Sequence, residues 1–253
     1  NVQCRIIVGG ILTSQKGVNF PTRSILAPGF TEKDHQDLLF GIKHGIDLIA
    51  LSYVKGAGDI ESVRTILKKE SADIPVIAKI ERKEALDRMD EILRASDGIM
   101  VARGDLGVET PLEKVPNVQK RLIRKANALG KPVITATQML RSMVDHTQPT
   151  RAEVTDVVNA IYDGTDAVML SEETASGQFP VEAAQMMAKI AQSAEEEFPF
   201  DQFLRREAEE EVDLPQAISH AASSLAKEVG AAAIVTPTES GSTSQWVSRL
   251  RPR

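Results

Sequence analysis

The sequence places one lysine and two carboxylates just beyond two successive apolar segments. Lys79 and Glu81 lie at the end of the apolar run 74–80, and Asp105 follows the apolar run 98–102. Side chains two positions apart in a strand project from the same face, so Lys79 and Glu81 would point together. Two carboxylates can hold a hard divalent cation such as Mg²⁺ or Mn²⁺, and an adjacent ammonium group can neutralise an oxyanion. These residue types at this spacing predict a metal-assisted site.

Each of these features also has a plain structural interpretation. A charged pair at a strand end is common, and the glycines at 104 and 107 are typical of a loop that needs positive φ. Alternatively, Gly104 would let backbone N–H groups approach a carboxylate or phosphate ahead of a helical turn. Because Asp105 follows the strand after the one that carries Lys79, we favour the functional interpretation.

The surrounding chain alternates strand-like and helix-period segments from residue 31 to about 198. The predicted strands are 47–53, 74–80, 98–102, 132–136 and 167–170. Each is followed by a helical segment, such as 83–93 and 151–162, and Thr150 with Glu153 forms a capping-box pair that opens the latter. This pattern indicates an α/β fold with a parallel sheet and right-handed crossovers. Polar residues follow every strand, and ligands bind at this carboxyl edge in α/β barrels and in open parallel sheets. Thr137 belongs to this rim, and beside a metal-bound enolate it could position a water or a proton.

The two ends of the chain do not follow this repeat. Residues 1–20 have the pattern of a β-hairpin, and the Glu-rich segment 199–213 resembles a linker. A new unit then begins with helix 216–229, strand 231–235 and a Ser/Thr-rich loop before a further helix. A loop of this composition at a helix start suits a phosphate, but an ordinary turn is the simpler interpretation.

Composition excludes several classes of protein. The chain has 253 residues, 30 Lys and Arg against 36 Asp and Glu, and a net charge of −6 without a basic block, which argues against nucleic-acid binding. A single cysteine, Cys4, rules out a disulfide framework within the chain. The start of the sequence lacks a signal-peptide pattern and no apolar run is long enough to span a membrane, so we expect a soluble cytoplasmic protein without a membrane partner.

Several longer motifs, in order along the chain, are similar to those of pyruvate kinase. They are PVIAKIE at 75–81, DGIMVARGDLGVE at 97–109, KPVITATQML at 131–140, PTRAE at 149–153 and DGTDAVMLS at 163–171. Motifs of this length are specific, and the resemblance runs through most of the chain. It implies phosphoryl transfer from phosphoenolpyruvate to ADP, giving pyruvate and ATP in the last step of glycolysis.

The resemblance also implies roles for individual residues. Lys79 resembles the lysine that stabilises the enolate and the phosphoryl-transfer transition state, and Thr137 the residue linked with enolate protonation. Glu81 and Asp105 resemble the ligands of Mg²⁺ or Mn²⁺. The implied phosphoenolpyruvate/pyruvate pocket consists of Lys79, Ala102, Arg103, Gly104, Asp105 and Thr137.

Further implied sites lie outside the rim. Lys16 and Asn19 resemble nucleotide contacts for ADP/ATP, and the resemblance revises the turn interpretation of the Ser/Thr-rich loop to a sugar-phosphate effector site. Its implied residues are Thr238, Ser240, Gly241, Ser242 and Thr243. At Glu239 the chain departs from the lysine that members responsive to sugar bisphosphates often have.

The family's eight-stranded barrel and lid domain set the expected organisation. We expect the end of a β-rich lid at 1–20 and a partial TIM (β/α)8 barrel of about five βα units at 21–198. A linker at 199–214 and the start of a C-terminal α/β regulatory domain at 215–253 would follow. The ligands of a K⁺ ion would lie outside this chain, and the full-length protein would be a homotetramer.

We therefore expect the 253-residue chain by itself to have little or no kinase activity. Two alternatives stay open at this point. One is a metal-dependent lyase or aldolase acting on pyruvate enolates, and the other is a non-catalytic metal-binding or assembly module.

Overall fold

The computed structural model describes residues 3–11, 30–203 and 214–252. Its centre is one sheet of five parallel strands in the order β1-β2-β3-β4-β5, so each strand pairs with its neighbour in sequence. The strands are β1 (Ile49–Leu51), β2 (Val76–Ile80), β3 (Gly98–Ala102), β4 (Val133–Ala136) and β5 (Ala167–Met169). The prediction of five βα units in a parallel sheet is confirmed. Within the described part of the chain the sheet does not close into a barrel, because β1 and β5 are both edge strands.

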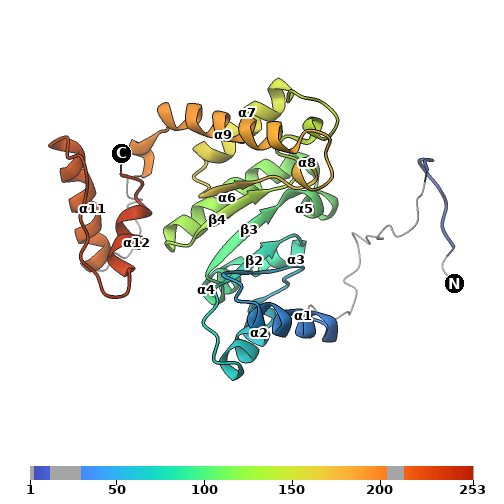
Figure 1. The fold of residues 1–253 in the computed structure, drawn as a ribbon, viewed down its shortest axis with the longest axis horizontal. Coiled ribbons are helices and arrows are strands. Elements are labelled where there is room, and N and C mark those ends of the chain that lie inside the picture. The colour runs from blue at the N-terminus through green and yellow to red at the C-terminus, as the bar shows by residue number, and fades with distance from the viewer. Residues whose placement is uncertain (1–2, 12–29, 204–213, 253) are drawn as a thin grey trace.

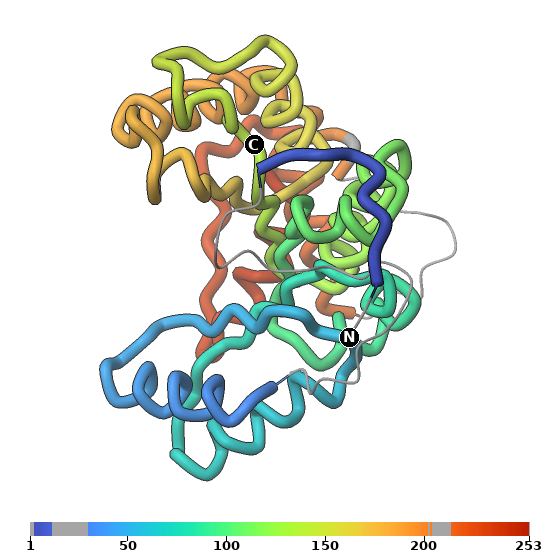
Figure 2. The backbone as a smooth tube through the Cα atoms, turned by 90° about the vertical axis from the view of Figure 1, so that its right-hand side faces the viewer, coloured from blue at the N-terminus to red at the C-terminus, as the bar shows by residue number. Residues whose placement is uncertain are grey.

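Helices follow the strands and pack on the sheet. The principal ones are α1 (Glu32–Lys43), α2 (Ala57–Lys69), α3 (Lys83–Asp87), α4 (Met89–Ala95), α5 (Arg103–Glu109), α6 (Val115–Ala128), α7 (Arg151–Tyr162) and α9 (Pro180–Glu196). Short turns of helix complete this region, namely η1 (Leu112–Lys114), η2 (Arg141–Val144), α8 (Glu172–Ala175) and α10 (Phe200–Phe203). In two perpendicular views, α1 and α2 lie at one end of the sheet and α7 and α9 at the other, as the strand order requires (Figures 1 and 2).

Local sequence signals explain where several helices begin and end. Capping boxes open α1, from Thr31 to Asp34, and α7, from Thr150 to Glu153. Gly45 and Gly130 adopt positive φ, at 69° and 66°, just beyond the ends of α1 and α6. The segment 83–93, predicted as one helix, is interrupted at Arg88, where φ is −114° and ψ is 22°.

The two faces of the sheet differ in what covers them. On one face, buried residues of α2, α4 and α6 form the main core with β1–β3, and α7 and α9 form a second core beside β5. The opposite face carries a small apolar cluster of Ile77, Met100 and Ala136. Lys79 lies two positions after Ile77 and pairs with Met100 in register, so it belongs to this second face.

The C-terminal unit consists of α11 (Leu214–Glu228) and α12 (Ser242–Ser248), which lie beside each other and apart from the sheet (Figure 1). It is joined to the sheet region by arginines. Arg249 donates to the Ala128 carbonyl at the end of α6 at 2.9 Å, and Arg251 donates to Gly164 O at 2.6 Å and Asp166 at 2.9 Å.

The strand predicted at 231–235 is wrong, because this segment pairs with no described strand. The hairpin predicted at 1–20 lies mostly outside the described residues, and its described part, 3–11, contains no strand. Ile6, Ile7, Val8 and Ile11 are each more than 80% exposed, so their apolar pattern has no partner surface in the described structure. A strand forms only where another strand accepts its hydrogen bonds. The helix that we predicted after the loop is confirmed as α12.

No helix in the described ranges is both long and apolar enough to cross a membrane.

Candidate active site

Lys79 and Glu81 lie together at the carboxyl end of β2. The Lys79 ammonium is 2.7 Å from Oε1 of Glu81, and it donates to the Ser52 hydroxyl, beyond β1, at 2.8 Å. Oε2 of Glu81 accepts the Tyr53 backbone N–H at 2.7 Å. The Glu81 side chain is only 2% exposed and that of Lys79 is 25% exposed, so the lysine compensates a buried carboxylate charge.

This pair retains capacity for a ligand. An ammonium group has three N–H donors, and Glu81 and Ser52 take two of those on Lys79. An ionised carboxylate offers about four acceptor positions, and Glu81 uses one on each oxygen. One lysine donor and two acceptor positions on the glutamate are therefore open to a bound oxyanion and a cation.

Asp105 lies in the first turn of α5, directly after β3. Its side chain is half-buried, and its carboxylate makes no hydrogen bond or ion pair with any described residue. No group of three or more His, Cys, Asp or Glu side chains suited to a metal occurs in the described ranges. Mg²⁺ commonly binds through one or two carboxylates and completes its octahedron with water and substrate oxygens. Glu81 and Asp105 supply two carboxylates, the number that this smaller requirement needs.

Thr137 follows β4 in a conformation that is unusual for its type. Its φ is 73° and that of Gln138 is 54°, although threonine is β-branched and rarely adopts positive φ. The Thr137 hydroxyl accepts the Gly104 N–H at 2.7 Å and donates to the Ala136 carbonyl at 2.6 Å. The turn after β4 is thereby attached to the start of α5.

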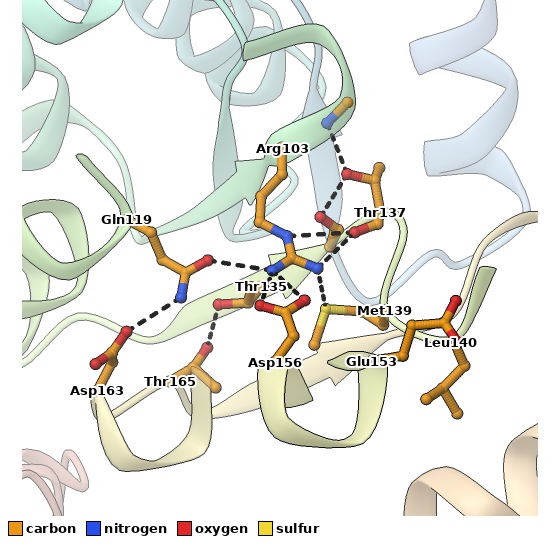
Figure 3. A network of polar contacts seen from close by, with 12 residues as sticks. Arg103, Gln119, Thr135, Thr137, Met139, Leu140, Glu153, Asp156, Asp163 and Thr165 are labelled. Atoms are coloured by element: carbon orange, nitrogen blue, oxygen red, sulfur yellow. Dashed lines mark hydrogen bonds and ion pairs between the residues drawn. The ribbon is translucent and has the colours of Figure 1, made fainter. Parts of the chain in front are cut away.

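The Arg103 side chain extends into the scaffold, where it contacts the turn after β4 and helix α7 (Figure 3). Its guanidinium donates to the Thr137 carbonyl at 2.8 Å and lies 2.6 Å from a carboxylate oxygen of Asp156 in α7. The side chain is only 10% exposed. The guanidinium of Arg103 is therefore engaged within the scaffold. Only the backbone of this predicted pocket residue is available to a ligand.

The glycines of this segment do not have the positive φ of the plain structural interpretation. Gly104 and Gly107 lie inside α5, and neither has positive φ. The loop interpretation is wrong because the segment continues directly from β3 into helical hydrogen bonding. The Gly104 N–H that was expected to face an anion is donated to the Thr137 hydroxyl.

Sequence reasoning missed Asp156 and gave Ser52 no particular role. Asp156 lies 53 residues from Arg103 and has the composition of an ordinary polar helix position, so no local signal marks it. Ser52 is one of the polar residues at the end of the predicted strand 47–53. Its position at the end of the strand beside β2 is the signal that could have paired it with Lys79.

The remaining predicted sites lie elsewhere or cannot be placed. Lys16 and Asn19 fall outside the described residues. The loop before α12 is stabilised internally: Thr238 Oγ1 accepts the Gly241 N–H at 3.1 Å, and Ser240 donates to the Ser242 hydroxyl at 3.0 Å. Gly241 has φ of 83°, and the side chains of this loop are exposed.

Comparison with known proteins gives two family matches along the chain. Residues 1–184 match the family described as pyruvate kinase, barrel domain, and residues 216–253 match pyruvate kinase, alpha/beta domain. The chain is 52% identical over 253 residues to pyruvate kinase 2 of Synechocystis sp., covering 100% of this chain and 42% of that protein.

Two further relatives agree. Pyruvate kinase of Clostridium acetobutylicum is 48% identical over 255 residues, with 100% of this chain and 54% of that protein covered. Pyruvate kinase of Geobacillus stearothermophilus is 52% identical over 250 residues, with 98% of this chain and 43% of that protein covered. The chain thus spans about half the length of the curated relatives it matches.

Proposed function

Because the chain belongs to the pyruvate kinase family, we propose that it carries part of an active site that transfers the phosphoryl group of phosphoenolpyruvate to ADP. The products are pyruvate and ATP. The observation that carries the proposal is the ion pair of half-buried Lys79 and buried Glu81, 2.7 Å apart at the carboxyl edge of a parallel sheet. Phosphoryl transfer depends on positioning and charge neutralisation more than on covalent help, and this pair is suited to both.

Lys79 supplies positive charge to the reaction. Its remaining N–H donor is available to an oxygen of the transferring phosphoryl group or of the enolate that its departure generates. Charge that develops in the transition state is stabilised most by a donor already fixed in place. The bonds to Glu81 and Ser52 fix the ammonium in this way.

Glu81 and Asp105 hold the divalent cation, Mg²⁺ or Mn²⁺, in this proposal. When bound, the cation supplies charge neutralisation at the substrate oxygens. The support from this chain is that the carboxylate of Asp105 has no partner in the described residues while that of Glu81 keeps open acceptor positions. The ligands of a K⁺ ion lie outside the chain.

Thr137 provides the proton in this scheme. The enolate needs a proton on its methylene carbon to become pyruvate, and a hydroxyl beside the substrate can deliver it while it takes a replacement proton from water. In the structure the Thr137 O–H is directed at the Ala136 carbonyl, so the hydroxyl must rotate before it can donate to a ligand. The backbone of Ala102 and Gly104 forms the adjoining wall of the substrate pocket.

The same proposal covers the parts of the protein away from the sheet. Lys16 and Asn19 contact the nucleotide, and the loop of Thr238, Ser240, Gly241, Ser242 and Thr243 takes a sugar-phosphate effector. The family matches, which end at 184 and resume at 216, support the division into a barrel part at 21–198, a linker at 199–214 and a C-terminal part at 215–253. A cytoplasmic homotetramer completes the proposal.

The test places this chain in a complete enzyme by exchanging it for the matching 43% of the Geobacillus stearothermophilus relative. Coupled assay of pyruvate formation should show turnover, and Lys79→Met should lower it by about a thousandfold or more because transition-state charge stabilisation is lost. Mn²⁺ affinity should change little, since Glu81 and Asp105 remain. Lys83→Met is the matched control. Lys83 is exposed and lies four positions after Lys79 in the sequence, so this variant should retain turnover.

Other outcomes would favour other functions. Turnover of Lys79→Met within tenfold of the parent would refute the role of the lysine. Cleavage of a carbon–carbon bond without ATP formation would indicate a lyase or aldolase. Mn²⁺ binding without any turnover in the exchanged protein would indicate a non-catalytic metal-binding module.

A further inference from the structure

The turn after β4 holds a backbone conformation that its sequence does not favour. Thr137 and Gln138 are consecutive non-glycine residues with φ of 73° and 54°. Such a conformation persists only where surrounding structure over-determines it. The contacts around Thr137 therefore identify what keeps the turn in place.

Arg103 makes the dominant contact with this turn. Its Nη2 and Nε atoms lie 2.8 Å and 3.3 Å from the Thr137 carbonyl oxygen, so the guanidinium grips one acceptor with two donors. The same Nη2 atom lies 2.8 Å from the sulfur of Met139. Figure 3 shows both contacts, and Met139 is fully buried.

The guanidinium is itself fixed from helices α6 and α7. Oδ1 of Asp156 accepts a hydrogen bond from Nη1 at 2.8 Å, and Oδ2 of Asp156 lies 2.6 Å from the same nitrogen. Gln119 accepts more weakly at 3.5 Å, and its amide donates to Asp163 at 3.1 Å. A planar guanidinium with fixed donors suits this arrangement, and a lysine cannot reproduce it.

The hydrogen bonds from Arg103 to the Thr137 carbonyl determine where the Thr137 hydroxyl lies. In the left-handed conformation the hydroxyl reaches the Gly104 N–H at 2.7 Å. An accepted hydrogen bond polarises a hydroxyl and strengthens it as a donor. If the backbone relaxed to negative φ, the hydroxyl would leave α5 and lose this bond.

We propose that Arg103, anchored by Asp156, is a positioning residue that holds the Thr137 hydroxyl at the active-site edge. The catalytic consequence rests on the proposed function, in which Thr137 delivers a proton to the enolate. The positioning itself does not rest on it, because the structural contacts lie within this chain.

The first experiment measures position alone. The ¹³C chemical shifts of the Thr137 Cα and Cβ, recorded on the 253-residue chain, report its backbone conformation. Arg103→Lys should move these shifts from left-handed toward extended values, and Asp156→Asn should move them in the same direction by less. Arg141→Lys, whose ion pairs with Glu172 and Asp145 are exposed, is the matched control and should leave them unchanged. Unchanged Thr137 shifts in Arg103→Lys would overturn the proposal whatever the protein catalyses.

The second experiment measures the consequence in the exchanged enzyme described above. Arg103→Lys should lower kcat by tenfold or more, with KM for phosphoenolpyruvate changed less than threefold. It should also slow exchange of the pyruvate methyl protons with deuterated water. Arg103→Ala should recover part of its kcat when millimolar guanidinium is added, which a general loss of folding would not produce.

The two proposals can fail separately. If the parent enzyme turns over and Arg103→Lys matches it within twofold, the positioning role is wrong and the proposed function stands. If the parent has no turnover but the Thr137 shifts move as expected, the positioning role stands and the proposed function is wrong.

Discussion

Glu153 connects the start of α7 to the preceding turn η2, and its removal gives a sharp test of the local structure. Its carboxylate accepts four hydrogen bonds. Two come from Thr150, from N at 2.8 Å and Oγ1 at 2.9 Å, and two from Ser142, from N at 2.7 Å and Oγ at 2.5 Å. Glu153→Ala deletes all four acceptor contacts, while Glu153→Gln leaves one acceptor oxygen.

The expected loss follows from where the donors lie. The Thr150 donors are exposed, so water replaces the carboxylate and the loss there is that of a helix cap, about 1 kcal/mol. The Ser142 donors are partly buried and lose bonds to a charged acceptor, which adds about 1–2 kcal/mol. Glu153→Ala should therefore lower the free energy of unfolding by about 2–3 kcal/mol and Glu153→Gln by about half that.

The same contacts make the effect depend on pH. Burial by itself would raise the pKa of Glu153, but the hydrogen bonds from Ser142 and Thr150 outweigh it and lower the pKa below its ordinary value of 4.5. A carboxyl group whose pKa is lowered by folding stabilises the folded state above its unfolded pKa. That stabilisation is lost as the pH falls from about 4.5 through the lowered value. The difference between the parent and Glu153→Gln should therefore shrink in acid.

Urea unfolding followed by circular dichroism, at pH 7 and through the acid range, measures both effects. Asp34→Ala is the control, because Asp34 closes the equivalent capping box of α1 but, among the described residues, accepts only from exposed Thr31. It should cost about 1 kcal/mol or less. Equal losses for Asp34→Ala and Glu153→Ala, or a Glu153→Gln difference that persists unchanged in acid, would refute the bridging role of Glu153.

Two further predictions concern packing. Gly98→Ala in β3 should lower the free energy of unfolding, measured by urea titration, by about 1–3 kcal/mol. The added Cβ would lie 2.8 Å from both the Pro132 carbonyl oxygen and Ile77 Cδ1. Gly58→Ala is the control and should not lower the free energy of unfolding, because the space around Gly58 is open. Arg251→Ala should loosen the C-terminal unit, because it removes the bonds to Gly164 and Asp166. Limited proteolysis should then cut between the unit and the sheet faster than in the parent, and an unchanged rate would contradict this anchor.

Local patterns in the sequence were sufficient to predict the repeating strand–helix architecture. Strand β3 and helix α7 have the predicted bounds, because an apolar run between turn residues and a capping box are signals contained in a few adjacent positions. The pair Lys79 and Glu81 was predictable for the same reason, since two positions along one strand determine a shared face.

Signals that need a partner were less reliable. The segment 231–235 has the composition of a strand but no described strand beside it, so it forms none. Residues 3–11 likewise have an apolar pattern without a surface to cover in the described structure. Apolar composition gives a propensity, and pairing decides whether a strand forms.

The sequence by itself determined that a lysine and two carboxylates would follow neighbouring strands of a parallel sheet, because the chain period and strand order depend on short-range patterns. Only the tertiary structure decided that Thr137 adopts a left-handed turn and that Arg103 points into the scaffold. The partner that orients Arg103 is Asp156, 53 residues away, and two side chains that distant in sequence meet only when the fold brings α7 within reach of the residue that follows β3. A hydrogen bond between remote residues has no counterpart in any local window of sequence, so its geometry had to come from the fold.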